Sequence, residues 1–234
     1  MKRIGLIGGL GPEATVDYYK AIIDAFKQGN AGKLNYPEII ISSVNMYAFI
    51  GKLEVGDYQG AVAYLADKLK ALERAGADFL ALTANTPHLF FSELQKEVNV
   101  PMLSIVEATA REAQRLGLKC PGLMGTAFTM NSGFFSEVFS RFGMEVIMPS
   151  SIQKKYINEK LFSEIELGIF KDETRDGLIE IIGEMKAEQQ IDCIIMGCTE
   201  LPLILEDSVY NGIPSLNTTQ IHVNEIVKWC KSDD

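Results

Sequence analysis

The chain has 234 residues, a net charge of −9 and 47% hydrophobic residues, values typical of a globular protein with one large domain or two small ones. The acidic charge and the lack of a basic run exclude nucleic acid as an expected partner, because phosphate binding requires clustered lysine and arginine. No apolar run approaches the about 20 residues that cross a bilayer. A predicted strand starts near the N-terminus, so we expect no membrane segment, no signal peptide and a cytoplasmic location.

Short β-branched runs alternate with longer stretches of helical periodicity along the whole chain. In the first half, the pattern predicts strands at 2–8, 38–44, 77–83 and 101–105, and helices at 13–26, 57–75, 87–97 and 107–116. In the second half, it predicts strands at 120–125, 144–149, 191–197 and 212–217, and helices at 132–142, 152–190 with a break near Gly168, 201–205 and 218–231. This alternation implies parallel sheets covered by helices on both faces.

The two halves share a layout. Each opens with a strand that ends in a glycine turn, "GLIGGLGPEAT" in the first and "GLMGTAFTM" in the second. Each later has an apolar strand that ends in small polar residues, "LALTANTPH" and "IIMGCTELP". We therefore expect an α/β fold of two similar lobes, the first formed by 1–102 with 212–234 and the second by 103–211.

The glycine turn after the first strand fits the pattern G-x-G-x-x-A at Gly9, Gly11 and Ala14, which is typical of dinucleotide binding. Two features argue against a dinucleotide. The second strand ends in "SSVN" without the acidic residue that binds ribose, and Pro12 removes a backbone N–H where a pyrophosphate needs donors. The pattern favours a tight turn beside a pocket for a small ligand.

Polar residues follow the third predicted strand in "TANTPH". Asn85 and Thr86 are good helix N-caps, and the alternative is that they hold a carboxylate together with the N–H groups of the next helix. His88 is a candidate ligand contact or a capping residue in the first turn of that helix.

The chain has four cysteines, at positions 120, 193, 198 and 230, with no CxxC pair and two isolated histidines. This pattern predicts neither a metal site nor a disulfide framework. Cys198 stands apart, because it follows a glycine at the carboxyl end of a strand, where open α/β sheets bind ligands. The N-terminus of the next helix is expected to lower the pKa of its thiol, and Thr199 and Glu200 can cap that turn. The other three cysteines are expected to be structural.

Taken together, four stretches resemble the aspartate/glutamate racemase family: "GLIGGLGPEAT", "GDY" at 56–58, "ANTPH" and "GCTELP". The resemblance spans nearly the whole chain. It implies two pseudo-symmetric α/β lobes with an active-site cleft between them, a homodimer and no cofactor. It also implies a small-molecule substrate, an amino acid or a dicarboxylate.

The resemblance further implies a two-thiol mechanism, in which one cysteine takes the α-proton and another returns a proton to the opposite face. The carbanion is then stabilised by hydrogen bonds to the substrate carboxylate. The matching positions in this chain are Asn85, Thr86, Thr126 and Thr199, the turn of Gly9, Leu10 and Gly11 that closes the pocket, and His88.

This chain departs from the family pattern in the first lobe. Many members have cysteine just before the Asn-Thr pair, where this chain has Ala84. Thr83 is the nearest hydroxyl, and it is a poor base because its pKa lies far above that of a thiol. Cys198 is retained. Some aspartate-specific members carry a lysine near the glycine at 168; here the candidate cations are Lys52, Lys155 and Lys160.

Three functions follow from these residues. The first is a racemase of aspartate or glutamate with Cys198 and Thr83 as the catalytic pair. The second is a one-cysteine enzyme that decarboxylates or isomerises a small dicarboxylate, as arylmalonate decarboxylases of the same superfamily do. The third is a protein that binds a carboxylate with little or no catalysis.

Overall fold

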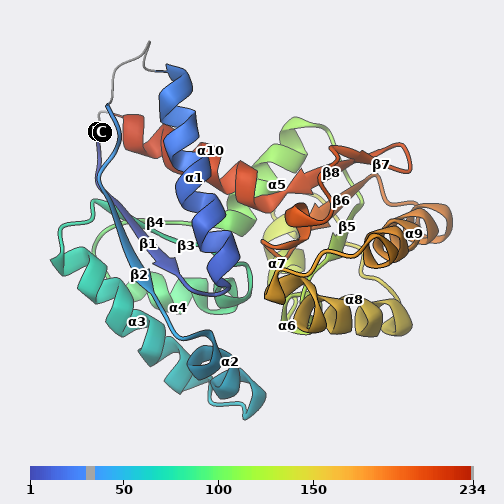
Figure 1. Ribbon diagram of the computed structural model, residues 1–234, viewed down its shortest axis with the longest axis horizontal. Helices are drawn as coiled ribbons and strands as arrows, with labels where there is room; N and C mark the ends of the chain where they lie inside the picture. The colour runs from blue at the N-terminus through green and yellow to red at the C-terminus, as the bar shows by residue number, and fades with distance from the viewer. Residues whose placement is uncertain (30–34, 233–234) are drawn as a thin grey trace. The chain divides into compact units, whose positions relative to one another are not determined.

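The computed structural model describes residues 1–29 and 35–232. The chain forms two compact units (Figure 1). Unit 1 comprises Met1–Ser104 and His222–Asp234, and unit 2 comprises Ile105–Ile221. Each unit is an α/β layer structure with its own sheet and its own hydrophobic core.

The sheet of unit 1 has four parallel strands in the order β2 (Ile39–Ser43), β1 (Ile4–Gly8), β3 (Phe79–Leu82) and β4 (Met102–Leu103). The helical elements are α1 (Pro12–Gly29), α2 (Met46–Glu54), α3 (Tyr58–Arg74), η1 (Thr86–Phe90) and α4 (Phe91–Lys96). All five residues of β1 are buried, as expected for a central strand with helices on both faces.

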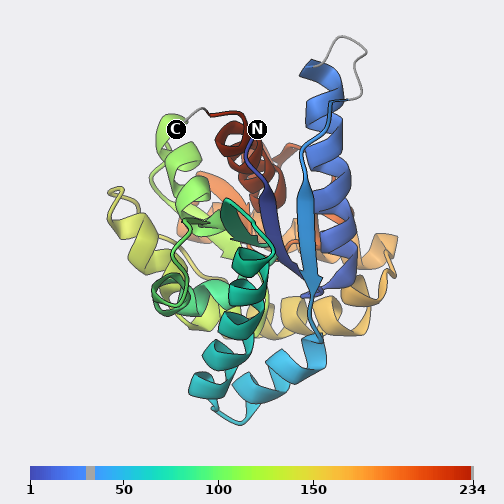
Figure 2. The same cartoon turned by 90° about the vertical axis from the view of Figure 1, so that its left-hand side faces the viewer.

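Alternate residues of the strands divide the core of unit 1 into two layers. Ile4 and Leu6 of β1 share a cluster with Tyr18 of α1 and with Val223 and Ile226 of the C-terminal helix α10 (Thr218–Lys231). Helix α3 packs on β1, β2 and β3 and buries its own apolar stripe. Figure 2 shows α1 and α3 beside the strands.

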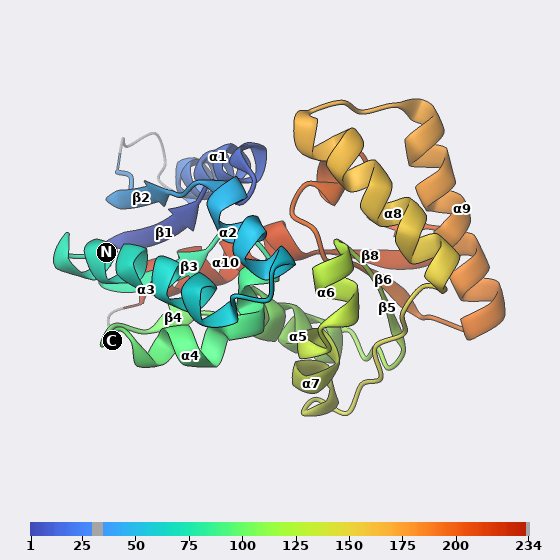
Figure 3. The same ribbon diagram turned by 90° about the horizontal axis from the view of Figure 1, so that it is seen from below.

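The sheet of unit 2 has the order β5 (Pro121–Met124), β6 (Cys193–Met196), β8 (Ile213–Asn217) and β7 (Val209–Tyr210). The first three strands are parallel, and β7 forms an antiparallel pair with β8. The helical elements before α10 are α5 (Ile105–Arg115), α6 (Ala127–Asn131), α7 (Phe134–Ser140), α8 (Ser151–Ser163), η2 (Ile165–Leu167), α9 (Asp172–Gln189) and η3 (Leu201–Leu203). Helices α8 and α9 lie side by side (Figure 3). The predicted α/β class with two helix-flanked parallel sheets is confirmed.

Several local expectations need correction. The strand predicted at 144–149 is reduced to one bridge, between Gly122 and Ile147. By contrast, the break predicted near Gly168 in the helical stretch at 152–190 is confirmed, because Gly168 has a φ of 72° and ends η2. The sequence analysis did not predict α2, α6 or β7. Helix α2 had a readable start signal, since the Asn45 side chain accepts a hydrogen bond from the Ala48 N–H at 3.2 Å.

The compact units depart from the expected division at the last crossover. We expected 212–234 to return to the first lobe, but β8 pairs with β6, so residues 212–221 lie in unit 2. Apolar periodicity predicted the strand correctly, but it carries no information about which sheet the strand joins. Within residues 1–29 and 35–232, every helix is too short or too polar to span a bilayer.

A buried hydrogen-bond relay in unit 1 joins α10 to the rest of the sheet layer. His222 Nε2 lies 3.0 Å from the Leu103 carbonyl oxygen, so this nitrogen must donate. Nδ1 therefore accepts, and its partner is the Tyr18 hydroxyl at 2.9 Å. His88 lies edge-on to His222 with ring centroids 6.4 Å apart, so the chain's two histidines meet in one core.

We predict that Tyr18→Phe lowers the free energy of unfolding by about 1–3 kcal/mol, because it leaves a buried imidazole nitrogen without its donor. Urea unfolding measures the change. Tyr19→Phe is the matched control, since Tyr19 neighbours Tyr18 on α1 and is 47% exposed; we expect almost no effect. Equal losses in the two variants would contradict the relay.

Candidate functional site

The carboxyl ends of β5 and β6 approach each other closely in unit 2. The Gly197 N–H donates to the Met124 carbonyl oxygen at 2.6 Å. A Cβ atom built on Gly125 would lie 2.9 Å from the Gly197 carbonyl oxygen, so a side chain does not fit there. Thr126 follows Gly125 and Cys198 follows Gly197. Both residues therefore lie at the same narrow edge of the sheet.

Thr126 and Thr199 are both buried at this edge. Thr126 is the N-cap of α6, and its Oγ1 accepts a hydrogen bond from the Thr129 N–H at 3.2 Å. The Thr199 hydroxyl donates to Glu200 Oε2 at 3.0 Å. Both predicted carboxylate-binding hydroxyls thus have structural partners here.

The Cys198 thiol lies between hydrocarbon and two carboxyl groups. The residue is 5% exposed and packs in the core cluster that includes Met196 and Leu201. Its Sγ is 3.2 Å from Glu200 Oε2 and 3.6 Å from Glu166 Oε1. A thiol can donate to either carboxylate, so the sulfur has polar partners as well as apolar packing.

The electrostatics of this thiol correct one expectation. Burial raises the pKa of Cys198 well above its ordinary value, and the negative charges of Glu200 and Glu166 raise it further. The expected lowering by a helix N-terminus is outweighed, because η3 is a three-residue 3₁₀ turn whereas the carboxyl groups are in direct contact. The resting form of Cys198 is therefore the neutral thiol.

The pKa of the Glu166 carboxyl group is also shifted from its ordinary value. Burial, followed by the charge of Glu200, raises the pKa of Glu166 to about 8, although the hydrogen bond from Cys198 acts in the opposite direction. Sequence reasoning missed Glu166, because no local pattern shows that a residue of η2 meets Cys198. Glu200 was expected only as a cap.

An ion-pair network holds the turn that carries Glu166. The Glu164 carboxylate, 7% exposed, accepts from Lys160 at 2.8 Å, from Lys171 at 3.1 Å and from Thr174 at 2.5 Å. These partners come from α8, α9 and the segment between them. Lys160 was a candidate cation for a substrate, and here it pairs with Glu164.

The glycine turn of unit 1 is built around Thr15, which the sequence analysis did not single out. Its hydroxyl accepts from the Gly9 N–H at 2.9 Å and donates to the Gly11 carbonyl oxygen at 3.1 Å. Gly9 has a φ of 83°, and a Cβ there would lie 2.4 Å from the Val44 carbonyl oxygen, so glycine is required. Leu10 is buried between them.

Thr83 is fully buried at the end of β3. Its hydroxyl donates to the Ile7 carbonyl oxygen at 3.1 Å and lies 3.3 Å from the Thr15 hydroxyl. Ala84 follows it and is 4% exposed. The structure therefore brings Thr83 together with the glycine turn, through Thr15.

The remaining predicted residues of unit 1 lie at the start of η1. Asn85 is buried and makes no side-chain cap to η1, while Thr86 is half-buried. His88 is buried, stacks on Phe91 and holds its Nδ1 2.9 Å from the Ala84 carbonyl oxygen. Burial lowers the pKa of His88 to about 4, so its ring is neutral at physiological pH.

Metal coordination is one possible use of a thiol with two carboxyl groups. Among residues 1–29 and 35–232, Glu166, Cys198 and Glu200 are the group of three whose ligand atoms all lie within 4.8 Å. The contacts between sulfur and carboxylate oxygen have hydrogen-bond lengths. We interpret the group as a hydrogen-bonded cluster.

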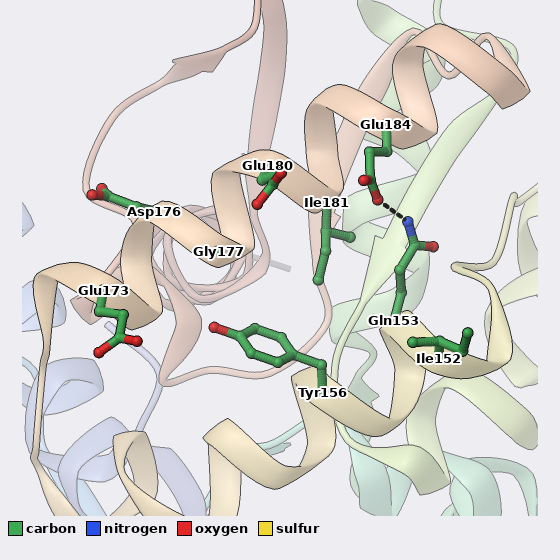
Figure 4. Close-up of a pocket in the computed structure, with 9 residues that line it drawn as sticks. All are labelled: Ile152, Gln153, Tyr156, Glu173, Asp176, Gly177, Glu180, Ile181 and Glu184. Atoms are coloured by element: carbon green, nitrogen blue, oxygen red, sulfur yellow. Dashed lines mark hydrogen bonds between the residues drawn. The ribbon is translucent and has the colours of Figure 1, made fainter.

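A separate hollow of about 770 Å³ lies on the surface of unit 2 between α8 and α9 (Figure 4). The Tyr156 ring points toward Gly177, where a Cβ would lie 2.4 Å from the hydroxyl. Acidic side chains of α9 line the hollow: Glu173, Asp176, Glu180 and Glu184. It contains none of the predicted site residues.

Two helix-flanked parallel sheets with polar clusters at the carboxyl ends of their strands define a class of α/β proteins that bind small molecules at the sheet edge. The model of the Asp/Glu/hydantoin racemase family matches residues 7–226. The chain belongs to this family.

Individual relatives agree with this assignment. The chain is 30% identical over 218 residues to the broad specificity amino-acid racemase RacX of Bacillus subtilis (strain 168), covering 92% of each chain. It is 35% identical to an aspartate racemase homologue of Pyrococcus horikoshii OT3, with a TM-score of 0.83 over 99% of this chain and 100% of that one. A putative Asp/Glu racemase from Yersinia pestis is 31% identical, with a TM-score of 0.88 over the same shares.

We predict that Glu164→Gln lowers the melting temperature at pH 7, because it weakens the network around η2. The three partners lower the pKa of Glu164 to about 2, so its stabilisation is present above the ordinary pKa of about 4.5 and is lost as the pH falls toward 2. The difference in melting temperature between wild type and variant should therefore shrink from pH 7 to pH 3.

Glu159→Gln on the exposed face of α8 is the control for this prediction. It should match the wild type at both pH values. A difference for Glu164→Gln that stays constant down to pH 2 would contradict the assigned network.

Proposed function

We propose that the protein is a cofactor-independent amino-acid racemase acting on aspartate or glutamate, with Cys198 as an acid/base. The observation that carries the proposal is the Cys198 thiol, held at the carboxyl end of β6 with carboxyl groups 3.2 and 3.6 Å away. These groups can accept and return its proton. Family membership supports racemase chemistry.

The reaction begins with the transfer of the substrate α-proton to the sulfur. The resulting carbanion needs hydrogen bonds to its carboxylate, which takes on enediolate character. We assign this role to Asn85 and Thr86 after β3 and to Thr126 and Thr199 in unit 2. In unit 1, the turn of Gly9, Leu10 and Gly11 and the neutral His88 ring are also assigned to substrate binding.

Thr83 is the proposed second acid/base, and its surroundings make proton transfer asymmetric. Its only hydroxyl proton is directed to the Ile7 carbonyl oxygen. Ala84, the next residue, offers a methyl group. We therefore propose that exchange of the α-proton of one enantiomer is faster than interconversion of the two.

A one-thiol reaction is the second candidate, and two observations favour it. Cys198 rests as a neutral thiol, which suits proton donation, and the methyl side chain of Ala84 has no acidic proton. Decarboxylation of a malonate-type acid needs protonation on one face only. Product formation from such an acid, with no racemisation of amino acids, would favour this candidate; ligand binding without turnover would favour a carboxylate-binding role.

The proposal includes a homodimer in the cytoplasm, as the family resemblance implies. The two aromatic residues of α2 differ in exposure, because Phe49 is fully buried whereas Tyr47 is 85% exposed. Of these two residues, only Tyr47 is available to a partner.

We predict that Cys198→Ser lowers α-proton exchange of L-aspartate and L-glutamate by at least about a hundredfold, because a hydroxyl is a far weaker acid than a thiol. Proton NMR in heavy water measures the exchange. Cys120→Ser, in the same unit just before β5, should retain the wild-type rate. Unchanged exchange in Cys198→Ser would refute the assignment.

We predict that Ala84→Cys raises interconversion of enantiomers by about tenfold or more relative to α-proton exchange, because it supplies a second thiol. Chiral chromatography gives the first rate and NMR the second. Ala84→Ser tests whether thiol acidity is the cause, and it should give no gain. A gain of equal size with serine would count against the thiol explanation.

A further inference from the structure

Lys155 differs from the other two lysines that the sequence offered as candidate cations. Lys52 pairs with Asp57, and Lys160 pairs with Glu164. Among the described residues, Lys155 has no ion-pair partner, and it lines a hollow of about 610 Å³ in unit 2. This hollow lies between α6 and α8, which are neighbours in Figure 3.

Helix α8 brings positive charge to this hollow. Four of its lining residues follow the i, i+3, i+4, i+7 spacing of one helix face: Ser151, Lys154, Lys155 and Asn158. The two lysines bring two formal positive charges and the neighbouring Glu159 brings one negative charge, in a chain with a net charge of −9. The hollow between α8 and α9 shares no residue with this one and is lined by four acidic side chains. Helix α8 therefore has a basic hollow on one side and an acidic hollow on the other.

Hydrogen bonds fix the orientation of two amide side chains at the basic hollow. The Ala127 N–H donates to Asn158 Oδ1 at 2.7 Å, and Lys154 Nζ donates to Asn131 Oδ1 at 3.0 Å. Neither a backbone N–H nor an ammonium group can accept a hydrogen bond, so each contact requires the oxygen of the amide. Asn131 and Asn158 are therefore left with their NH₂ groups to offer to a ligand.

The lining consists mainly of hydrogen-bond donors. Two ammonium groups, two amide NH₂ groups and the Ser151 hydroxyl can donate, and Glu159 is the one carboxyl group among the described residues of the lining. Donors with a positive charge favour an anion. Lysine binds an anion as a point charge and is common at phosphate sites, whereas the planar fork of arginine matches a carboxylate. The donor set therefore favours a phosphate group.

We infer that this basic hollow is a second binding site of unit 2, which takes a phosphate group from a free phosphate ion or from a small phosphorylated molecule. Its volume lies within the range of about 300–1,000 Å³ that is typical of small-molecule pockets. The lining contains none of Glu166, Cys198 and Glu200. Ala127 directly follows Thr126, so α6 is the element that the hollow shares with the proposed racemase site.

NMR of the ¹⁵N-labelled full chain tests the site directly. The side-chain NH₂ signals of Asn131 and Asn158 are followed during titration with inorganic phosphate and, separately, with glycerol phosphate. Sodium chloride holds the ionic strength constant, because added salt screens exposed charges. We expect both signals to shift and to saturate with one dissociation constant. Tighter binding of glycerol phosphate supports a phosphorylated molecule as the source, and equal binding supports the free ion.

Three substitutions test the donors and the charge, with the Asn131 signal as the readout in each variant. Asn158→Asp keeps the oxygen that accepts from Ala127 and replaces the NH₂ donor with a carboxylate oxygen, so the dissociation constant should rise at least about tenfold. Lys155→Ala removes a positive charge and should raise it about fivefold. Glu159→Gln removes the repelling charge and should lower it about twofold.

Two matched controls change the net charge elsewhere. Lys228→Ala, on the exposed face of α10, and Gln114→Glu, on the exposed face of α5, should bind phosphate as the wild type does. If Asn158→Asp fails to fold, the opposite changes in Lys155→Ala and Glu159→Gln still decide the result.

Three outcomes would overturn the inference. The first is wild-type affinity in both Asn158→Asp and Lys155→Ala, and the second is an equal shift of the two amide signals with sodium chloride alone. The third is displacement of phosphate by an equal concentration of L-aspartate, which would assign the hollow to the substrate site. None of these measurements depends on turnover, so they are independent of the α-proton exchange that tests the racemase.

Discussion

The burial of one thiol against two carboxyl groups is the constraint on which the rest of unit 2 depends. Removing a carboxylate from water is costly unless it is hydrogen-bonded, and removing two from water side by side is more costly still. Hydrogen bonds from Thr199 and Cys198 offset this cost for Glu200. Glu166 avoids the cost at neutral pH because its raised pKa keeps it mainly protonated. A chain under selection for stability alone would place apolar residues here, so the cluster points to chemistry.

The surrounding scaffold serves to hold this arrangement in place. The glycines at 125 and 197 let β5 and β6 end close together, and the ion pairs of Glu164 fix the turn between α8 and α9. Unit 1 has an uncharged counterpart, in which Thr15 holds the glycine turn and its hydroxyl lies 3.3 Å from the Thr83 hydroxyl. In both units, hydroxyl groups at the ends of buried strands have specific partners, as Thr83 and Thr126 show.

The chain departs from the family pattern at Ala84, and this departure makes the two units differ in the side chain that follows the buried strand. Unit 2 keeps a thiol with a proton acceptor beside it, whereas the corresponding position of unit 1 has a methyl group next to a hydroxyl that is already hydrogen-bonded. The chain belongs to the Asp/Glu/hydantoin racemase family, whose model matches residues 7–226.

The sequence by itself determined the fold class, most strands and helices, and the place of Cys198, because these depend on local periodicity, capping and a glycine at a strand end. Helix α10 was predicted with its observed bounds, since Asn217 caps it locally through the Gln220 N–H. Only the tertiary structure decided the pairing of β8, the meeting of the two histidines and the presence of Glu166 at the sulfur. Those contacts join residues far apart in the chain, and burial then reversed the pKa shift that the local pattern of Cys198 indicated.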